Sequence, residues 1–293
     1  MTEMKLLFIT HEMSPFLEMT DIADVVRKLT DSVQEKAQEL LDKAKATQVK
    51  GQGMQGKGLE IRILMPRFGN INAHRNKLHE VIRLSGLNIT IDDKDNPLIG
   101  RVASIARVQV YFLDNEDFFQ RKYVFRDKDN KFYADNDERA IFFCKGALEA
   151  VKKLGWAPNI VHCHGWMSSL VPAYLKTIYK DDPTYKNTKV VYSVYQDDLA
   201  ETLGSRFAEK ATMNGMTPAD TELYVPADIT ALNKGAISYA DAVVYGSDKV
   251  NPDVAKFAKK TNKLLLEYPA TLDFENYYNL YQDVINEELI SIA

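Results

Sequence analysis

The chain has 293 residues, 45% of them hydrophobic, which supports a buried core and excludes a disordered chain. Its 41 acidic and 37 basic residues give a formal net charge of −4, and no run of about five or six like charges marks a nucleic-acid interface, so we expect no nucleic-acid partner. The apolar start is too short for a signal peptide, and no segment approaches the roughly 20 apolar residues that span a bilayer, so we expect a cytoplasmic protein without a membrane partner.

Short apolar runs alternate with longer amphipathic stretches along the chain. This strand, helix, strand order predicts an α/β fold with a doubly wound parallel sheet and helices on both faces. Such a sheet binds ligands at the carboxyl ends of its strands. The predicted strands lie at residues 5–10, 60–66, 107–114, 160–162, 189–195, 242–245 and 263–268, and the predicted helices lie at 21–45, at 138–154, from 166, near 229–239 and at about 273–292.

A glycine-rich insertion at about 46–58 interrupts this order, with four glycines between residues 51 and 58. We predict a flexible surface loop there. A phosphate-binding loop is disfavoured, because Gly58 follows Lys57 where Ser or Thr would have to hold magnesium.

The C-terminal helix predicted at about 273–292 carries tyrosines and aliphatic residues at helical spacing. We expect this stripe to pack back on the same domain. A partner-binding helix is the alternative, since the same stripe would serve either purpose.

Two histidines and a cysteine, His162, Cys163 and His164, follow one of the predicted strands. Neighbours on a strand point to opposite faces, and no second pair of ligands with suitable spacing is present, so we predict structural or cleft-lining histidines and no metal site. The chain has two cysteines, Cys144 and Cys163. Two are too few for a disulfide framework, and we expect buried thiols in a reducing compartment. No G-x-G-x-x-G follows the first strand, so NAD is not predicted as a cofactor.

Seven segments, in the same order along the chain, resemble the bacterial glycogen and starch synthases. These enzymes are glycosyltransferases of family 5 that move glucose from ADP-glucose to an α-1,4-glucan. The resemblance implies the N-terminal starch synthase catalytic domain, which is the Rossmann-like half of a GT-B glycosyltransferase, with ADP-glucose as the donor substrate and no separate cofactor. The segments and the family patterns that they resemble are 5–16 (S-E-x-x-P-F), 23–26 (A-D-V-V), 62–71 (R-V-L-L-P-x-Y-x-x-I), 110–114 (V-Y-F-I-D), 133–139 (Y-x-D-N-x-x-R-F), 156–164 (W-x-P-D-I-I-H-x-H) and 238–243 (Y-A-D-x-V-T).

The donor-binding stretch departs from the family pattern. The family carries K-x-G-G-L just before A-D-V, and its glycines let backbone amides approach the donor phosphates. Here Glu18 replaces the lysine, and Thr20 and Asp21 replace the glycines. At about 4 Å and an effective dielectric near 20, each like-charge contact costs on the order of 4 kcal/mol, so donor phosphates are not expected to bind in the family's manner.

Two further family positions have changed after the later strands. Gly165 stands where the family's H-x-H-D-W-H has an active-site aspartate, and Tyr195 stands where T-x-H-N has the histidine that contacts the transferred sugar. The degenerate catalytic positions are therefore Glu18, Gly165 and Tyr195. By their place at the strand ends, the expected substrate-binding residues are Glu12, Asp21, His164, Trp166 and Gln196.

Family members also have a second Rossmann-like domain, for which the stretch after Asp248 leaves little room. We therefore predict a single domain over residues 1–293, a synthase relative that is catalytically inactive alone and binds α-1,4-glucan. Two alternatives stay open. One is an active transferase subunit completed by a partner chain, and the other is a non-enzymatic regulator that docks on a true synthase.

Overall fold

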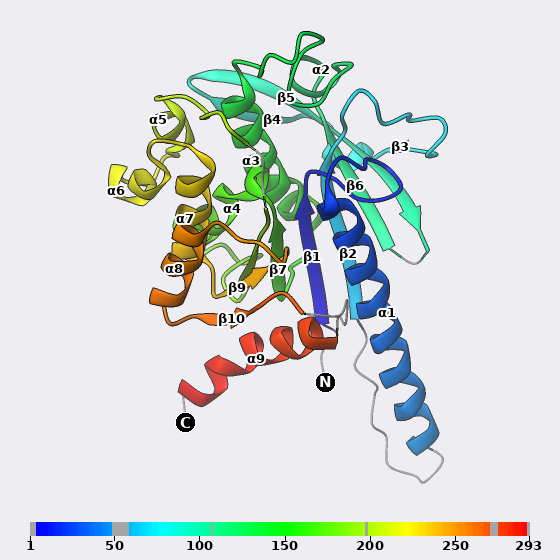
Figure 1. The fold of residues 1–293 in the computed structure, drawn as a ribbon. Helices are drawn as coiled ribbons and strands as arrows, with labels where there is room; N and C mark the ends of the chain where they lie inside the picture. The colour runs from blue at the N-terminus through cyan, green and yellow to red at the C-terminus, as the bar shows by residue number, and fades with distance from the viewer. Residues whose placement is uncertain (1–3, 49–58, 107, 197–198, 270–274, 292–293) are drawn as a thin grey trace.

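One mixed sheet forms the centre of the protein (Figure 1). The computed structural model describes residues 4–48, 59–106, 108–196, 199–269 and 275–291. Within these residues the sheet has ten strands. Nine follow the order β10-β9-β8-β7-β1-β2-β6-β5-β3, and the tenth, β4, pairs with β5. The strands are β1 Met4–Thr10, β2 Leu59–Pro66, β3 His79–Glu80, β4 Leu87–Ile91, β5 Lys94–Ile105, β6 Val108–Asp114, β7 Ile160–His164, β8 Lys189–Val194, β9 Ala242–Tyr245 and β10 Leu264–Leu266.

The strands from β10 to β6 in this order are all parallel, which confirms the predicted doubly wound α/β fold. The sequence did not predict the antiparallel edge formed by β3, β4 and β5. Pro97 and Gly100 interrupt the alternating pattern of β5, and these are residue types that weaken a strand signal. Gly100 is required there by packing, because a Cβ would lie 2.2 Å from Leu84 Cδ1.

Helices cover both faces of the parallel strands (Figure 1). The helices α1 and α9 lie on one face, and α3 and α4 lie on the other. Within the described residues no helix combines the length and the apolar character that a membrane span requires. The helices are α1 Asp21–Gln48, α2 Glu116–Phe119, α3 Asn136–Leu154, α4 Leu170–Lys176, α5 Phe207–Ala211, α6 Pro218–Thr221, α7 Ile229–Tyr239, α8 Pro252–Lys260 and α9 Glu275–Ser291, with single 3₁₀ turns η1 Ile82–Leu84, η2 Trp166–Ser168 and η3 Glu222–Tyr224.

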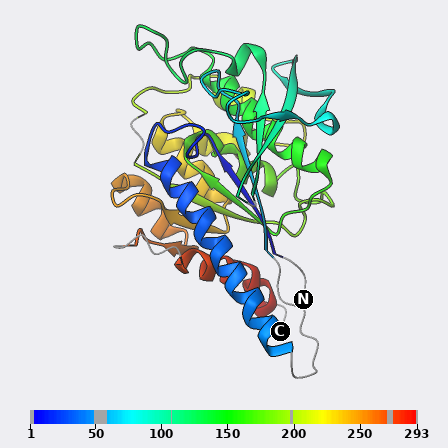
Figure 2. The ribbon, with the colours of Figure 1, turned by 90° about the vertical axis from the view of Figure 1, so that its right-hand side faces the viewer.

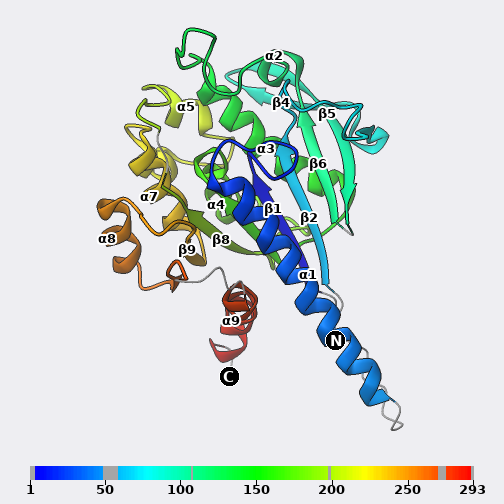
Figure 3. The same ribbon diagram turned by 45° about the vertical axis from the view of Figure 1, so that its right-hand side comes forward.

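Helix α1 runs from the carboxyl edge of the sheet to beyond the opposite edge (Figure 3). Its buried stripe begins with Ile22, Val25 and Val26 and continues at helical spacing to Leu29 and Val33. The helix continues through residues 46–48, where the flexible loop was predicted to begin. That boundary is wrong, because no glycine or proline interrupts the helix before residue 51. The rest of the predicted loop, residues 49–58, lies outside the described residues.

Helix α9 packs against α1 (Figure 2), and an ion pair of 2.8 Å joins Lys36 Nζ of α1 to Glu275 Oε1 of α9. The tyrosines of its stripe, Tyr277 and Tyr281, are buried. Tyr281 Oη lies 2.7 Å from Nδ1 of His162 on β7, so α9 contacts the sheet through a polar contact as well as an apolar one.

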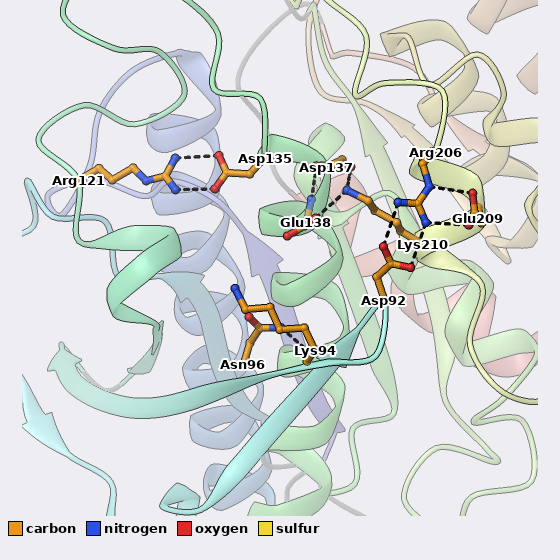
Figure 4. A network of polar contacts seen from close by, with 10 residues as sticks. All are labelled: Asp92, Lys94, Asn96, Arg121, Asp135, Asp137, Glu138, Arg206, Glu209 and Lys210. Atoms are coloured by element: carbon orange, nitrogen blue, oxygen red, sulfur yellow. Dashed lines mark hydrogen bonds and ion pairs between the residues drawn. The ribbon is translucent and has the colours of Figure 1, made fainter.

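Ion pairs tie the segment after β8 to the other half of the sheet (Figure 4). Lys210 of α5 lies 2.7 Å from Asp137 and 2.6 Å from Glu138, both in the first turn of α3. Arg206 donates a hydrogen bond of 3.0 Å from Nη2 to Oδ1 of Asp92, at the turn between β4 and β5, and its Nη1 lies 3.0 Å from Oδ2 in an ion pair. These contacts hold α5 and the residue before it against the first turn of α3 and the β4–β5 turn.

Candidate functional site

A cleft of about 530 Å³ opens at the carboxyl ends of β8 and β9, against the first turn of α1. Figure 3 shows this turn of α1 beside the carboxyl end of β1. The neighbouring strands β1 and β7 form the point at which the chain reverses its direction across the sheet, where a doubly wound sheet holds its ligands. The lining residues are Met19, Thr20, Asp21, Ile22, Asp24, Val25, Lys28, Tyr195, Gln196, Gly246, Ser247, Asp248 and Tyr268.

The charged groups that line the cleft are mainly acidic. Asp21, Asp24 and Asp248 contribute carboxylates, and Lys28 contributes an ammonium group. Repulsion between like charges over a few ångströms disfavours an anionic ligand. The lining therefore suits a neutral, hydroxyl-rich ligand, whose hydroxyl groups can donate hydrogen bonds to the carboxylates.

Behind the cleft, the carboxylate of Glu12 satisfies the backbone donors that precede α1. Glu12 is fully buried and accepts hydrogen bonds from the backbone N–H of Met19 at 2.6 Å and from that of Thr20 at 3.0 Å. The Thr20 hydroxyl donates a third, short hydrogen bond to it. A negative charge at this end also complements the dipole of α1. An anion-binding position at a helix N-terminus is thus occupied by a side chain of the protein itself.

Gly165, directly after β7, is a strained and crowded position for any side chain. Its backbone angles are φ 74° and ψ 173°, a region that essentially only glycine adopts. A Cβ at this position would lie 3.0 Å from Cε1 of His11 and 3.1 Å from Cδ1 of Ile22. The imidazole of His11 therefore covers the space into which a longer residue at 165 would extend.

His11 is itself buried, in contact with Glu12 and aromatic rings. Its Nε2 lies 3.6 Å from the Glu12 carboxylate, and its ring lies 5.7 Å from Phe125 and 6.2 Å from Trp166, measured between ring centres. Burial lowers the pKa of His11, and the charge of Glu12 only partly opposes this effect. Lowering the pKa of a histidine favours the neutral imidazole near pH 7.

His164 and Tyr195 form a buried pair between the carboxyl ends of β1 and β7 and the cleft. Nδ1 of His164 lies 2.8 Å from the Tyr195 hydroxyl, and the Tyr195 ring packs so closely on Gly246 that a Cβ there would lie 2.4 Å from it. Burial, and secondarily the nearby His11, lowers the pKa of His164 to about 3. A neutral imidazole with these contacts is a structural group rather than a proton-transfer group near pH 7.

His162 continues this buried polar group away from the cleft. Its ring stacks on that of His164 with centres 4.0 Å apart, and its Nε2 lies 2.7 Å from the Ser193 hydroxyl. Burial, followed by repulsion from His164, lowers the pKa of His162 well below its ordinary value. Together with the contact to Tyr281, these interactions connect α9 to the strand ends that border the cleft.

The structure brings some of the predicted site residues into the cleft and places the others behind it or at the surface. Trp166 packs against Phe125 with ring centres 5.0 Å apart and is 4% exposed, so it offers no ring face to a sugar. In the described part of the chain, no group of three or more His, Cys, Asp or Glu side chains is arranged to hold a metal. Asp21, Tyr195 and Gln196 line the cleft; Glu12, His164, Gly165 and Trp166 are buried; and Glu18 is exposed, with its carboxylate 2.6 Å from the Ser14 hydroxyl.

Of the 13 lining residues, the sequence reasoning had predicted only Asp21, Tyr195 and Gln196 as site residues. Ser247, Asp248 and Gly246 follow β9, and Tyr268 follows β10. The rule that ligands bind at the carboxyl ends of parallel strands, applied to these two strands, would have found them. Asp24 and Lys28 are predictable only from the approach of α1 to the cleft.

Comparisons with known proteins identify the family and support the fold. The model of a family described as the starch synthase catalytic domain matches residues 45–266. A glycogen synthase of Chlorobium luteolum is 34% identical over 198 residues, which cover 65% of this chain and 35% of that protein. A glycogen synthase of Chlorobaculum tepidum is 32% identical over 256 residues, which cover 84% of this chain and 46% of that protein. The chain thus spans between about a third and a half of the length of these curated relatives.

Among solved structures, the catalytic domain of starch synthase IV from Arabidopsis thaliana, bound to ADP and acarbose, aligns with 90% of this chain and 51% of its own. The TM-score is 0.62 and the sequence identity is 18%. At this identity the comparison concerns the fold, which the two proteins share.

Proposed function

The chain belongs to the starch synthase catalytic domain family, and from this premise we propose that its cleft binds an α-1,4-glucan and offers no site to the phosphates of a nucleotide sugar. On this proposal the chain does not transfer glucose by itself. Its fold is the Rossmann-like half of a GT-B glycosyltransferase, so the proposal concerns what the cleft of that fold can still hold.

The loss of the family's two glycines carries the proposal. Thr20 and Asp21 stand in their place, whereas Glu12 matches the glutamate of the family pattern S-E-x-x-P-F. The backbone N–H groups of Met19 and Thr20 donate to the Glu12 carboxylate, and the Thr20 hydroxyl, which a glycine lacks, adds a further hydrogen bond that holds this carboxylate in place. A diphosphate that binds before α1 needs free backbone N–H groups, and displacing the buried carboxylate from them is strongly unfavourable.

The charge of the cleft lining also favours a glucan over a nucleotide sugar. Asp21, which replaces a family glycine, lines the cleft at the first turn of α1 and would repel phosphates there. A glucan carries no charge, so it meets no such repulsion, and its hydroxyl groups can donate hydrogen bonds to the carboxylates of the lining. The names of the relatives and the acarbose in the Arabidopsis structure make an α-glucan the preferred ligand class.

The backbone at Gly165, directly after β7, supports the absence of transfer activity. The resemblance implies that an aspartate acts at the position of Gly165, and the positive φ of Gly165 together with the His11 ring disfavours a longer side chain there. Tyr195 replaces a histidine but is buried and hydrogen-bonded to His164, so it has no free ring face. Both changes fit a cleft that holds a sugar chain without acting on it.

Titration calorimetry of the purified chain tests the proposal, with maltoheptaose, ADP-glucose and ADP as separate ligands. We expect saturable heat with maltoheptaose and none with either nucleotide. As a matched control, cellohexaose presents the same sugar units in β linkage and should bind more weakly. Saturable binding of ADP-glucose by the unaltered chain would contradict the proposal and favour an active transferase subunit that a partner chain completes.

The other alternative, a regulator that docks on a true synthase, gives a different result. It predicts no heat with maltoheptaose or with the nucleotides, and a complex with a purified glycogen synthase on size-exclusion chromatography. That combination of results would overturn glucan binding by this cleft.

A further inference from the structure

The cleft continues into two neighbouring hollows along the carboxyl edge of β8, β9 and β10. A hollow of about 280 Å³ shares Tyr195 and Gln196 with the cleft. A second hollow, of about 640 Å³, shares Ser247, Asp248 and Tyr268 with it. The shared lining residues show that both hollows adjoin the cleft along this edge, and we refer to the three spaces together as the groove.

Tyr268 stands at the boundary between the cleft and the larger hollow. It follows β10, and its side chain is partly exposed. The other aromatic residues that line these spaces, Tyr195 and Tyr245, are 4% and 8% exposed. Among the described lining residues, Tyr268 is therefore the aromatic ring that a ligand in the groove can reach.

A partly exposed aromatic ring in a groove suits a sugar chain for a physical reason. One face of a pyranose ring presents C–H groups, which pack on the electron-rich face of an aromatic ring, while its hydroxyl groups point outward to polar partners. Gln196 and Asp248 supply such partners on the cleft side of the ring. On the far side Glu267 is 3.0 Å from Lys259, so the charge of its carboxylate is balanced.

We propose that Tyr268 stacks on a sugar ring of a linear α-1,4-glucan that runs from the cleft over Tyr268 into the hollow beside Tyr245 and Val250. This inference rests on the proposed function and adds to it a residue that selects for chain length. A short sugar fills the cleft alone, whereas a longer chain reaches Tyr268 and gains its contact. Affinity should therefore rise with chain length until the groove is filled.

The test compares maltose, maltotriose and maltoheptaose by calorimetry on the unaltered chain and on Tyr268→Ala, Tyr268→Phe and Tyr123→Ala. We expect Tyr268→Ala to weaken maltoheptaose binding about tenfold, a loss at the upper end of what an aromatic contact contributes. Tyr268→Phe keeps the ring and should bind maltoheptaose as the unaltered chain does. Tyr123 is 42% exposed and lines none of these spaces, so Tyr123→Ala is the matched control.

The outcomes separate this inference from the proposed function. Equal maltoheptaose affinity of the unaltered chain and of Tyr268→Ala would overturn the inference and leave glucan binding intact. A lack of binding to the unaltered chain would overturn both. If Tyr268→Ala binds weakly, its melting temperature must match that of Tyr268→Phe. A lower melting temperature would mean that the loss of affinity comes from a loss of folding. That result would count against the stacking role.

Discussion

The two halves of the carboxyl edge of the sheet differ in how their space is used. At the ends of β1 and β7 the protein fills the edge with its own side chains: Glu12 binds the backbone before α1, and His11 lies over Gly165. At the ends of β9 and β10 the edge is open, with Ser247, Asp248 and Tyr268 lining hollow space. The same fold thus holds a closed half that supports its stability and an open half that is available to a ligand.

The largest expected effect concerns the closed half, at Gly165. A Gly165→Ala variant should lose about 3 kcal/mol of unfolding free energy, because alanine is strained at this backbone conformation and its Cβ contacts His11. Urea denaturation measures the loss. Gly204→Ala is the matched control, because Gly204 also has a positive φ, of 90°, but its Cβ would meet nothing within 4 Å.

A double variant separates the two causes. If the His11 ring contributes to the cost, His11→Ala combined with Gly165→Ala should lose less stability than the sum of the single variants. Equal losses in Gly165→Ala and Gly204→Ala would instead show that the His11 ring yields without cost, and the closed half would then be less tightly packed than the distances indicate.

The second prediction concerns Glu12. Glu12→Gln should lose about 2 kcal/mol of unfolding free energy, because an amide retains one acceptor oxygen but turns its NH₂ group toward donors that need a carboxylate. Glu18→Gln is the matched control in the same turn, since Glu18 is exposed and contacts the Ser14 hydroxyl, and its loss should stay within about 0.5 kcal/mol. Similar losses in the two variants would mean that Glu12 is not the anchor of the turn before α1.

The third prediction uses the buried imidazoles of the closed half. Burial lowers the pKa of His11, His162 and His164 below the value of an unfolded chain, so the unfolded state takes up protons first as the pH falls. Stability should therefore be fully present above about pH 6.5 and fall below it, by up to about 1.4 kcal/mol per pH unit for each histidine. For His164 the loss should continue down to its folded pKa of about 3.

Urea titrations between pH 7.5 and 5 measure this slope. A His164→Gln variant should show a slope smaller by about one proton than that of the unaltered chain. An unchanged slope in His164→Gln would mean that His164 binds a proton equally well in the folded and unfolded states, contrary to its burial.

The sequence predicted the parallel strands well and the site only in part, for identifiable reasons. Continuous apolar runs such as 242–245 mark buried parallel strands by themselves, whereas β5 carries Pro97 and Gly100 within a strand and gives no clear alternation of apolar residues. The loss of the glycines at Thr20 and Asp21 could be seen in the sequence. The contact between Glu12 and the amide of Thr20 could not, because seven residues lie between them and only the folded turn sets that distance.

The smallest expected effect on stability is in the open half. A substitution there should change ligand binding more than folding, the reverse of what we expect in the closed half. Asp248 is exposed in the cleft lining, so Asp248→Asn should change the unfolding free energy by no more than about 0.5 kcal/mol. Its effect should fall on the ligand instead: an amide oxygen accepts a sugar hydroxyl less strongly than a carboxylate does, so maltoheptaose affinity should drop a few-fold, by about 1 kcal/mol or less. Calorimetry and urea denaturation of the same preparation give both quantities. A variant that loses stability and keeps its affinity would reverse the assignment, because Asp248 would then belong to the internal packing of the edge and the ligand would have to lie elsewhere in the groove.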